Sequence, residues 1–204
     1  LEEKLKITEF FEMMSDHILQ NIESRRTEEY LDKRDIPTEV AEIMGIGYLD
    51  YKKFNQQLLK KGLTPSDYEQ YGYKDENFTN TKLTFILRDE YGKAMSFATR
   101  ELVFEEKIAR KKLRKYLDKE LVNKTSKRGL KDLVIKAVNE GMTKEDAEFV
   151  SLAATIPKYK NGNENLLFKK RNSLYGLHVA KRHKTTFSTI YLVEGYMDCI
   201  TSYK

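Results

Sequence analysis

The segment YLVEGYMDCI, residues 191–200, places an acidic residue directly after an apolar run. Residues 188–193 predict a buried strand, and the chain from Gly195 onward predicts a turn that leads into a helix. In open α/β sheets, ligands bind outside the carboxyl ends of the strands, which is where Glu194 would lie. Asp198 follows four residues later, so one helical turn would return it to the same side. Two such carboxylates can hold Mg²⁺, although an acid after a strand is more often a turn or capping residue.

The composition describes a basic protein of modest size. The chain has 204 residues, of which 40% are hydrophobic and 34% charged, enough for one fair-sized domain or two small ones. Its net charge of +5 and isoelectric point near 9.0 make a polyanion such as nucleic acid a candidate partner. Cys199 is the only cysteine, which excludes an intrachain disulfide and a zinc ribbon, so we expect no zinc and a reducing compartment. No apolar run approaches the roughly 18 residues of a membrane span, so we expect a cytoplasmic protein without a membrane partner.

Short helices alternate with one predicted hairpin along the chain. Apolar spacing and turn residues indicate helices over residues 4–22, 26–33, 37–45 and 51–62, and another from 64 onward. Strands are predicted over Lys82–Arg88 and Ala94–Leu102, joined by a turn at 89–92. Residues 104–155 are helical and highly charged, residues 156–170 are loop-like, and residues 172–184 predict a further helix.

A basic run marks the charged helical segment. Between Lys107 and Lys136 there are twelve Lys or Arg against three Asp or Glu, an excess of nine positive charges. Such a run forms either a solvated helical face or a surface that faces nucleic acid, and the sequence leaves both readings open.

The residues upstream of Glu194 carry a specific pattern of motifs. PKYKN, F-K-K, LYGL and VEGYMD follow one another in order within residues 157–200. This stretch closely resembles the bacterial DnaG-type primases, whose pattern runs P-K-Y-L-N-S-x-E-T, F-x-K, L-Y-G-L-x-x-A and V-E-G-Y-M-D. The residues in register are Pro157, Lys158, Tyr159, Asn161, Glu164, Phe168, Lys170, Leu174, Tyr175, Gly176, Leu177, Ala180 and Val193 to Asp198.

The resemblance extends upstream. FILRDEYGKAMSFATREL at 85–102 and EEYLDKRDIPTEVAEIMGIGY at 28–48 are similar to further motifs of the same family, except that Ala98 and Thr99 replace two glycines. Residues 103–156 have no counterpart in the family pattern, so we interpret them as an insertion.

The resemblance implies an α+β fold. A helical N-terminal part, a small antiparallel sheet and the helical insertion would be followed by the first strand and helix of a TOPRIM α/β fold. Residues 1–188 would form the N-terminal subdomain of the primase core, and residues 189–204 the start of the TOPRIM domain. Because the chain starts at Leu1 and the family's later Asp-x-Asp motif would come after Lys204, we expect a fragment with an incomplete metal site that alone makes no primers.

The resemblance also implies roles for particular residues. Glu194 would be the catalytic acid/base group and a metal ligand, and Asp198 would support the same site, which would hold Mg²⁺ or Mn²⁺. Template and nucleotide binding would fall to Lys82, Arg100, Lys158, Tyr159, Asn161 and Lys170. Lys82 stands where the family often has arginine, and a lysine offers a point charge in place of a bidentate fork.

The implied function is that of a DNA primase. The parent enzyme would join nucleoside triphosphates into short RNA primers on a single-stranded DNA template in a bacterial cell, and a phage is a candidate source of the gene. It would contact a replicative helicase through regions absent from this chain. Two alternatives stay open: another TOPRIM phosphoryl-transfer protein, such as a nuclease or topoisomerase relative, and a non-catalytic single-strand binding module that acts through residues 107–136.

Overall fold

The computed structural model describes residues 1–78, 82–101, 105–155, 157, 159–183, 186 and 189–204, apart from the side chains of Arg25, Arg26, Lys82, Glu101 and Glu105. The chain divides into two compact units. Unit 1 comprises Leu1–Leu102 with Tyr159–Lys204, and unit 2 comprises Val103–Lys158.

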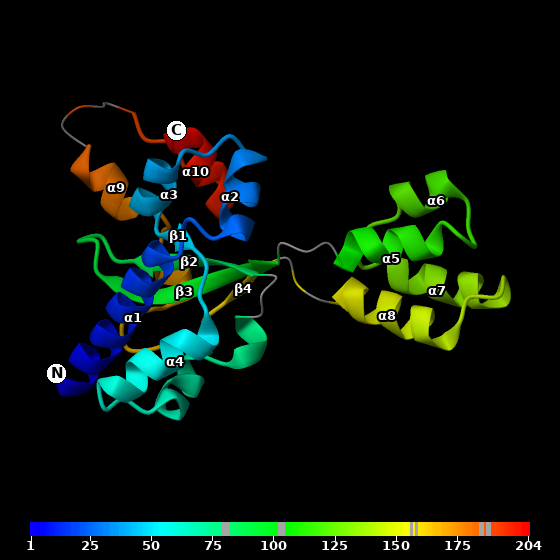
Figure 1. The fold of residues 1–204 in the computed structure, drawn as a ribbon. Helices are drawn as coiled ribbons and strands as arrows, with labels where there is room; N and C mark the ends of the chain where they lie inside the picture. Colours follow the sequence, from blue (N-terminus) through cyan, green and yellow to red (C-terminus); the bar gives the residue numbers. More distant parts are fainter. Residues whose placement is uncertain (79–81, 102–104, 156, 158, 184–185, 187–188) are drawn as a thin grey trace. The chain divides into compact units, whose positions relative to one another are not determined.

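Unit 1 is built on a four-stranded antiparallel sheet in the order β1-β2-β3-β4 (Figure 1). Its strands are β1 (Ile46–Gly47), β2 (Lys82–Arg88), β3 (Ala94–Glu101) and β4 (Tyr159–Asn161). The predicted hairpin is confirmed: β2 pairs with β3, and Gly92 adopts a φ of 88° in the turn. Strand β4 was not predicted, because its three residues lie in the segment that the sequence indicated as a loop.

The first face of the sheet is covered by α1 (Glu2–Gln20), α4 (Tyr51–Lys60) and two 3₁₀ segments, η1 (Pro65–Tyr71) and η2 (Asp75–Asn77). The core here is rich in aromatic rings, and Phe10 of α1 stacks on Tyr68 with ring centroids 3.9 Å apart. Helix α1 approaches the sheet so closely that a Cβ on Gly47 would lie 2.3 Å from the carbonyl oxygen of Ile18. Glycine is therefore required at this point of contact.

The second face is covered by α2 (Arg25–Asp32), α3 (Thr38–Met44), α9 (Leu177–Arg182) and α10 (Tyr196–Tyr203). Leu83, Phe85 and Leu87 of β2 contribute to this core, whereas Ile86 contributes to the core on the first face. Side chains of a strand alternate between faces, so both faces of β2 are buried.

Several predicted helix boundaries are confirmed by local chemistry. The Asp50 carboxylate accepts a hydrogen bond from the Lys53 N–H at 3.1 Å and caps α4, and Gly45 ends α3 with a φ of 67°. The helix predicted over 172–184 is shorter than expected. Gly176 takes a left-handed conformation with a φ of 79°, and α9 starts only after it, at Leu177. A short 3₁₀ turn, η3 (Lys170–Asn172), lies before Gly176 in the chain.

Unit 2 is a helical unit with its own core. It contains α5 (Glu105–Leu113), α6 (Lys119–Lys124), α7 (Leu130–Asn139) and α8 (Lys144–Thr155). The Asp146 N–H donates to the Thr143 hydroxyl at 3.2 Å, which caps the start of α8. None of the helices described in either unit combines the length and apolar character that a membrane span requires.

The predicted buried strand before Glu194 is wrong. Residues 189–193 form no strand, and Ile190, Tyr191 and Leu192 are 72%, 79% and 81% exposed. A strand is stabilised by a hydrogen-bonded neighbour, and within the described residues no strand pairs with this segment. The segment instead borders an apolar groove lined by α3, α9 and α10.

Candidate nucleic-acid and metal site

Helix α10 is docked onto strand β4. The Tyr196 hydroxyl donates to Oδ1 of Asn161 at 2.7 Å, and the rings of Tyr196 and Tyr159 meet edge to face with centroids 5.5 Å apart. Tyr196 also stacks on Phe85 of β2 at 5.5 Å. These contacts bring the VEGYMD segment beside the strand that carries two other predicted site residues.

Arg100 lies at the centre of this region, on β3 opposite Tyr159 of β4. Arg100 is only 6% exposed, and its guanidinium donates a hydrogen bond to the Tyr159 hydroxyl. The guanidinium also lies over two rings, 5.3 Å from the centroid of Tyr30 and 5.0 Å from that of Tyr159. Ring faces stabilise a buried cation, so in this structure Arg100 holds the two tyrosines in place and does not present its charge to solvent.

Two residues that sequence reasoning did not select extend the cluster outward. Arg34 is exposed, and its guanidinium carbon lies 5.3 Å from the ring centroid of Tyr30, the same ring that Arg100 contacts. Tyr30 belongs to α2 and Arg34 follows two residues after that helix ends. The four-residue spacing in YLDKR was the available signal, because residues four apart share a helix face. We call Arg34, Tyr30, Arg100 and Tyr159 the cation–aromatic ladder.

The tyrosine hydroxyls of this region are held in their neutral form. Burial raises the pKa of Tyr30 to about 12 and that of Tyr196 to about 12. Burial also raises the pKa of Tyr159, while the nearby Arg100 lowers it and Asp198 raises it. Near neutral pH these groups therefore serve as rings and hydrogen-bonding hydroxyls, not as proton acceptors.

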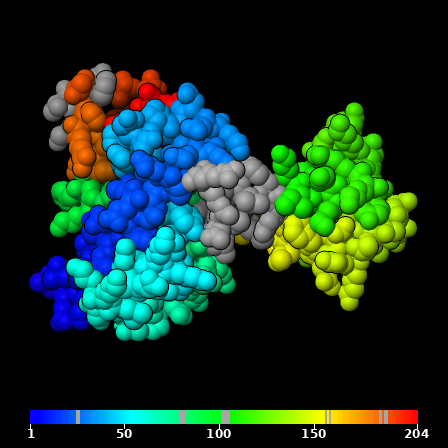
Figure 2. Space-filling view, in the orientation of Figure 1, coloured from blue at the N-terminus to red at the C-terminus, as the bar shows by residue number. Residues whose placement is uncertain are grey.

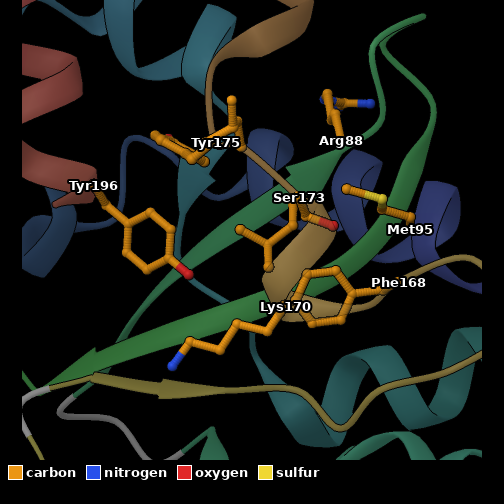
Figure 3. Close-up of a pocket in the computed structure, with 9 residues that line it drawn as sticks. Arg88, Met95, Phe168, Lys170, Ser173, Tyr175 and Tyr196 are labelled. Atoms are coloured by element: carbon orange, nitrogen blue, oxygen red, sulfur yellow. The ribbon is translucent and has the colours of Figure 1, made fainter. Parts of the chain in front are cut away.

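Lys170 lies beside a small cleft on the same face of the sheet. The cleft has a volume of about 40 Å³ and is lined by Leu87, Arg88, Met95, Phe168, Lys170, Ser173, Leu174, Tyr175 and Tyr196 (Figure 3). A cavity of this size admits only a few waters and no nucleobase.

The two cations of the cleft differ in their availability. The Arg88 guanidinium is engaged, donating to the Gly92 carbonyl oxygen at 2.9 Å and the Ser15 hydroxyl at 2.5 Å. Lys170 is exposed, and among the described residues no acid pairs with its ammonium group. Lys170 is therefore the cation that this cleft offers to an incoming anion.

Glu194 and Asp198 are both exposed at the start of α10. Gly195 leaves room for the second carboxylate, since a Cβ there would lie 2.9 Å from Oδ2 of Asp198. Within the described part of the chain neither carboxylate has an ion pair, and no three His, Cys, Asp or Glu side chains group together as a metal site. Two unpaired carboxylates suit Mg²⁺ or Mn²⁺, which take oxygen ligands and can retain several waters.

The structure therefore brings together Arg100, Tyr159, Asn161 and Asp198, with Lys170 beside the adjoining cleft. For Lys82 only the backbone is described, paired with Glu101, and its side chain lies outside the described residues. Lys158 also lies outside them. Ala98 and Thr99 are fully enclosed, paired with Asn161 and Lys160 of β4.

Comparisons with known proteins confirm the resemblance to DnaG-type primases. A curated DNA primase of Clostridium acetobutylicum is 51% identical over 45 residues, which make up 22% of this chain and 7% of that protein. No protein-family model matches the chain.

Solved structures identify the fold. The RNA polymerase domain of Mycobacterium tuberculosis primase DnaG matches with a TM-score of 0.62 and 18% identity, covering 98% of this chain and 53% of its own. A DnaG primase catalytic domain bound to single-stranded DNA matches with a TM-score of 0.60 and 19% identity, covering 98% of this chain and 52% of its own. The α+β fold is thus that of DnaG catalytic cores, and the chain spans about half the length of these structures.

Proposed function

We propose that this chain is part of a DnaG-type DNA primase, whose full-length form makes RNA primers from nucleoside triphosphates on single-stranded DNA. The observation that carries the proposal is the docking of α10 on β4 through the Tyr196–Asn161 hydrogen bond of 2.7 Å. This contact is accompanied by the proximity of the Asp198 carboxylate to Tyr159 of the cation–aromatic ladder, and Glu194 lies two residues before α10 starts. The 51% identity to a curated primase and the DnaG fold support it.

The exposed cations would hold the polynucleotide. Lys170 and Arg34 present positive charge on the second face of the sheet, and phosphate contacts of this kind position a strand without reading its bases. Arg100 would act through its neighbours, because its buried guanidinium fixes Tyr30 and Tyr159. Lys82 and Lys158 stay candidates for triphosphate binding on the resemblance alone.

The carboxylates would serve the chemistry. Glu194 and Asp198 would hold Mg²⁺ or Mn²⁺, as the start of a TOPRIM site formed by residues 189–204 after a primase-core subdomain over 1–188. Such a metal, when bound, would neutralise charge on the transferring phosphoryl group. Glu194 would also take the proton from the attacking 3′-hydroxyl, since its exposed carboxylate has no competing ion pair among the described residues. A replicative helicase would be contacted by other parts of the full-length protein.

The reaction type decides between primase and the other TOPRIM enzymes. The full-length protein, given a single-stranded DNA template, four nucleoside triphosphates and Mg²⁺, is expected to make RNA oligomers whose sequence complements the template. The same preparation is tested for cleavage of the template and relaxation of supercoiled plasmid. RNA synthesis supports the proposal, whereas cleavage or relaxation without RNA synthesis would overturn it.

A further inference from the structure

The positive charge of the chain is concentrated in unit 2. Residues 103–158 contain fourteen Lys or Arg and nine Asp or Glu, a net charge of +5. Unit 1 contains twenty-three of each and has no net charge. The +5 of the whole chain therefore comes from unit 2 alone, and a polyanion that binds by charge would be attracted to this unit.

Unit 2 can present this charge on a rigid scaffold. Its helices enclose eleven buried side chains, all from the unit itself: Ala109, Leu113, Val122, Leu130, Leu133, Val134, Ala137, Met142, Val150, Ala153 and Ala154. Figure 2 shows the side chains of α5 to α8, coloured green to yellow, packed as one body. A unit with its own core keeps its surface residues in fixed positions.

Some of the cations are used inside the unit. The Arg110 guanidinium pairs with Glu106 at 2.7 Å and donates to the Thr125 carbonyl oxygen at 3.0 Å, which ties α5 to the end of α6. Lys112 pairs with Asp146 of α8, and both side chains are largely buried. These cations contribute to the fold of the unit and are unavailable to a partner.

The remaining cations form the candidate surface. Six are exposed and, among the described residues, have neither an ion pair nor a side-chain hydrogen bond; we call them the free cations of unit 2: Lys111, Lys115, Lys119, Arg128, Lys131 and Lys136. The segment 107–117 that contains the first two has six Lys or Arg and no acid. Lys111 lies on α5 and Lys115 follows two residues after that helix ends, and both are exposed, whereas Ala109 and Leu113 face the core.

The chemistry of these cations indicates how the partner is recognised. Five of the six are lysines, which are point charges that contact phosphate without the planar fork of arginine. Among the described residues of the unit, the aromatic side chains of Tyr116 and Phe149 are partly buried, and Phe149 lies under Lys112 at 5.3 Å, so neither is a fully exposed platform for base stacking. Recognition would depend on the phosphate backbone and not on the bases.

We infer that unit 2 is a second, sequence-independent nucleic-acid contact that holds the polynucleotide backbone through its free cations. This inference rests on the proposed function for the choice of nucleic acid over other polyanions. In the sequence, unit 2 lies between β3, which carries Arg100, and β4, which carries Tyr159.

The test removes charge from the free cations in the whole 204-residue chain. Lys111→Gln, Lys115→Gln and Lys119→Gln are combined, because glutamine and lysine have similar helix propensity. The control combines Lys52→Gln, Lys60→Gln and Lys61→Gln, three exposed lysines of unit 1 on and beside α4 with the same loss of charge. Binding of fluorescent 30-nucleotide single-stranded DNAs of two unrelated sequences is measured by anisotropy between 0.05 and 0.5 M salt.

Three lost phosphate contacts reduce the slope of log K against log salt by about 2, equivalent to about 100-fold weaker binding at 0.1 M salt. The inference predicts this loss for both DNA sequences in the unit 2 variant, and less than a threefold change in the control. Equal losses in the two variants would overturn it, as would wild-type binding to vesicles of anionic lipid without binding to DNA. Failure of RNA synthesis by the full-length protein would refute the proposed function while leaving the salt result intact, so the two claims fail separately.

Discussion

The two cations Lys170 and Arg100 should respond to substitution in opposite ways. Lys170 is exposed, whereas Arg100 is 6% exposed and enclosed by the rings of Tyr30 and Tyr159. If Lys170 contacts one phosphate, Lys170→Met lowers the slope of log K against log salt by about 0.7, which is about fivefold in affinity at 0.1 M salt. Its effect on the free energy of unfolding should stay within about 0.5 kcal/mol, as for other surface substitutions.

Arg100→Lys keeps the charge and removes the planar guanidinium. The lysine loses a charged hydrogen bond to Tyr159, about 1.5 kcal/mol, and part of its contact with two rings, about 0.5 kcal/mol. A total of about 2 kcal/mol corresponds to a decrease of roughly 4–8 °C in the unfolding midpoint of a chain of this size. The salt slope should not change, because the number of charges is the same.

The free energy of unfolding of each variant is measured by circular dichroism during urea unfolding. The slope of log K against log salt is measured by anisotropy with labelled single-stranded DNA. Lys52→Met on α4 is the matched control for the loss of one exposed charge. The reasoning is refuted if Arg100→Lys leaves stability unchanged, or if Lys170→Met alters the salt slope no more than Lys52→Met does.

Two further predictions concern the fold. Gly47→Ala would place a Cβ 2.3 Å from the Ile18 carbonyl oxygen, and a backbone atom cannot move aside as a side chain can. We therefore expect the free energy of unfolding, measured in urea, to decrease by about 3 kcal/mol. A decrease below about 1 kcal/mol would contradict the close approach of α1 to the sheet. Burial lowers the pKa of His17 and of His178, so the unfolded chain binds more protons below pH 6.5 and the free energy of unfolding falls as pH decreases from 7 to 5. A His17→Gln/His178→Gln variant should show a shallower decrease over that range, and an equally steep one would contradict this assignment.

Local chemistry predicted many of the elements correctly. The Asp50 cap, the left-handed Gly45 and the turn at Gly92 each depend on residues within four positions of one another. Such signals can be read from one sequence because their energetics are local. The hairpin of β2 and β3 was predictable for the same reason, since adjacent strands and a tight turn are contiguous in the chain.

The failures concern residues whose state depends on distant parts of the chain. Residues 189–193 have the composition of a strand, but strand formation needs a pairing partner that the segment itself does not contain. Strand β4 has three residues and no hydrophobic period, so its pairing with β3 could be recognised only in three dimensions. Arg100 was predicted to bind template or nucleotide, yet α2 and β4 supply the rings that enclose its side chain.

The candidate site shows the same division. The motif resemblance selected Tyr159, Asn161 and Asp198, and the structure brings them together through Tyr196. It did not select Tyr30, because the contact of Tyr30 with Arg100 joins residues far apart in the sequence, nor Arg34, which belongs to the cluster only through Tyr30. The roles of Glu194 and Asp198 in metal binding stay predictions that solution measurements can decide.

The central claim is that Glu194 serves the chemistry while the exposed cations Lys170 and Arg34 hold the template. Its most direct test is to measure template affinity and the rate of RNA synthesis on the same preparation of full-length protein carrying Glu194→Gln. We predict a rate at saturating template and Mg²⁺ that is lower by at least about 100-fold, with a template Kd within twofold of wild type. A variant that synthesises RNA at the wild-type rate, or that loses activity only because its template affinity collapses, would contradict the account.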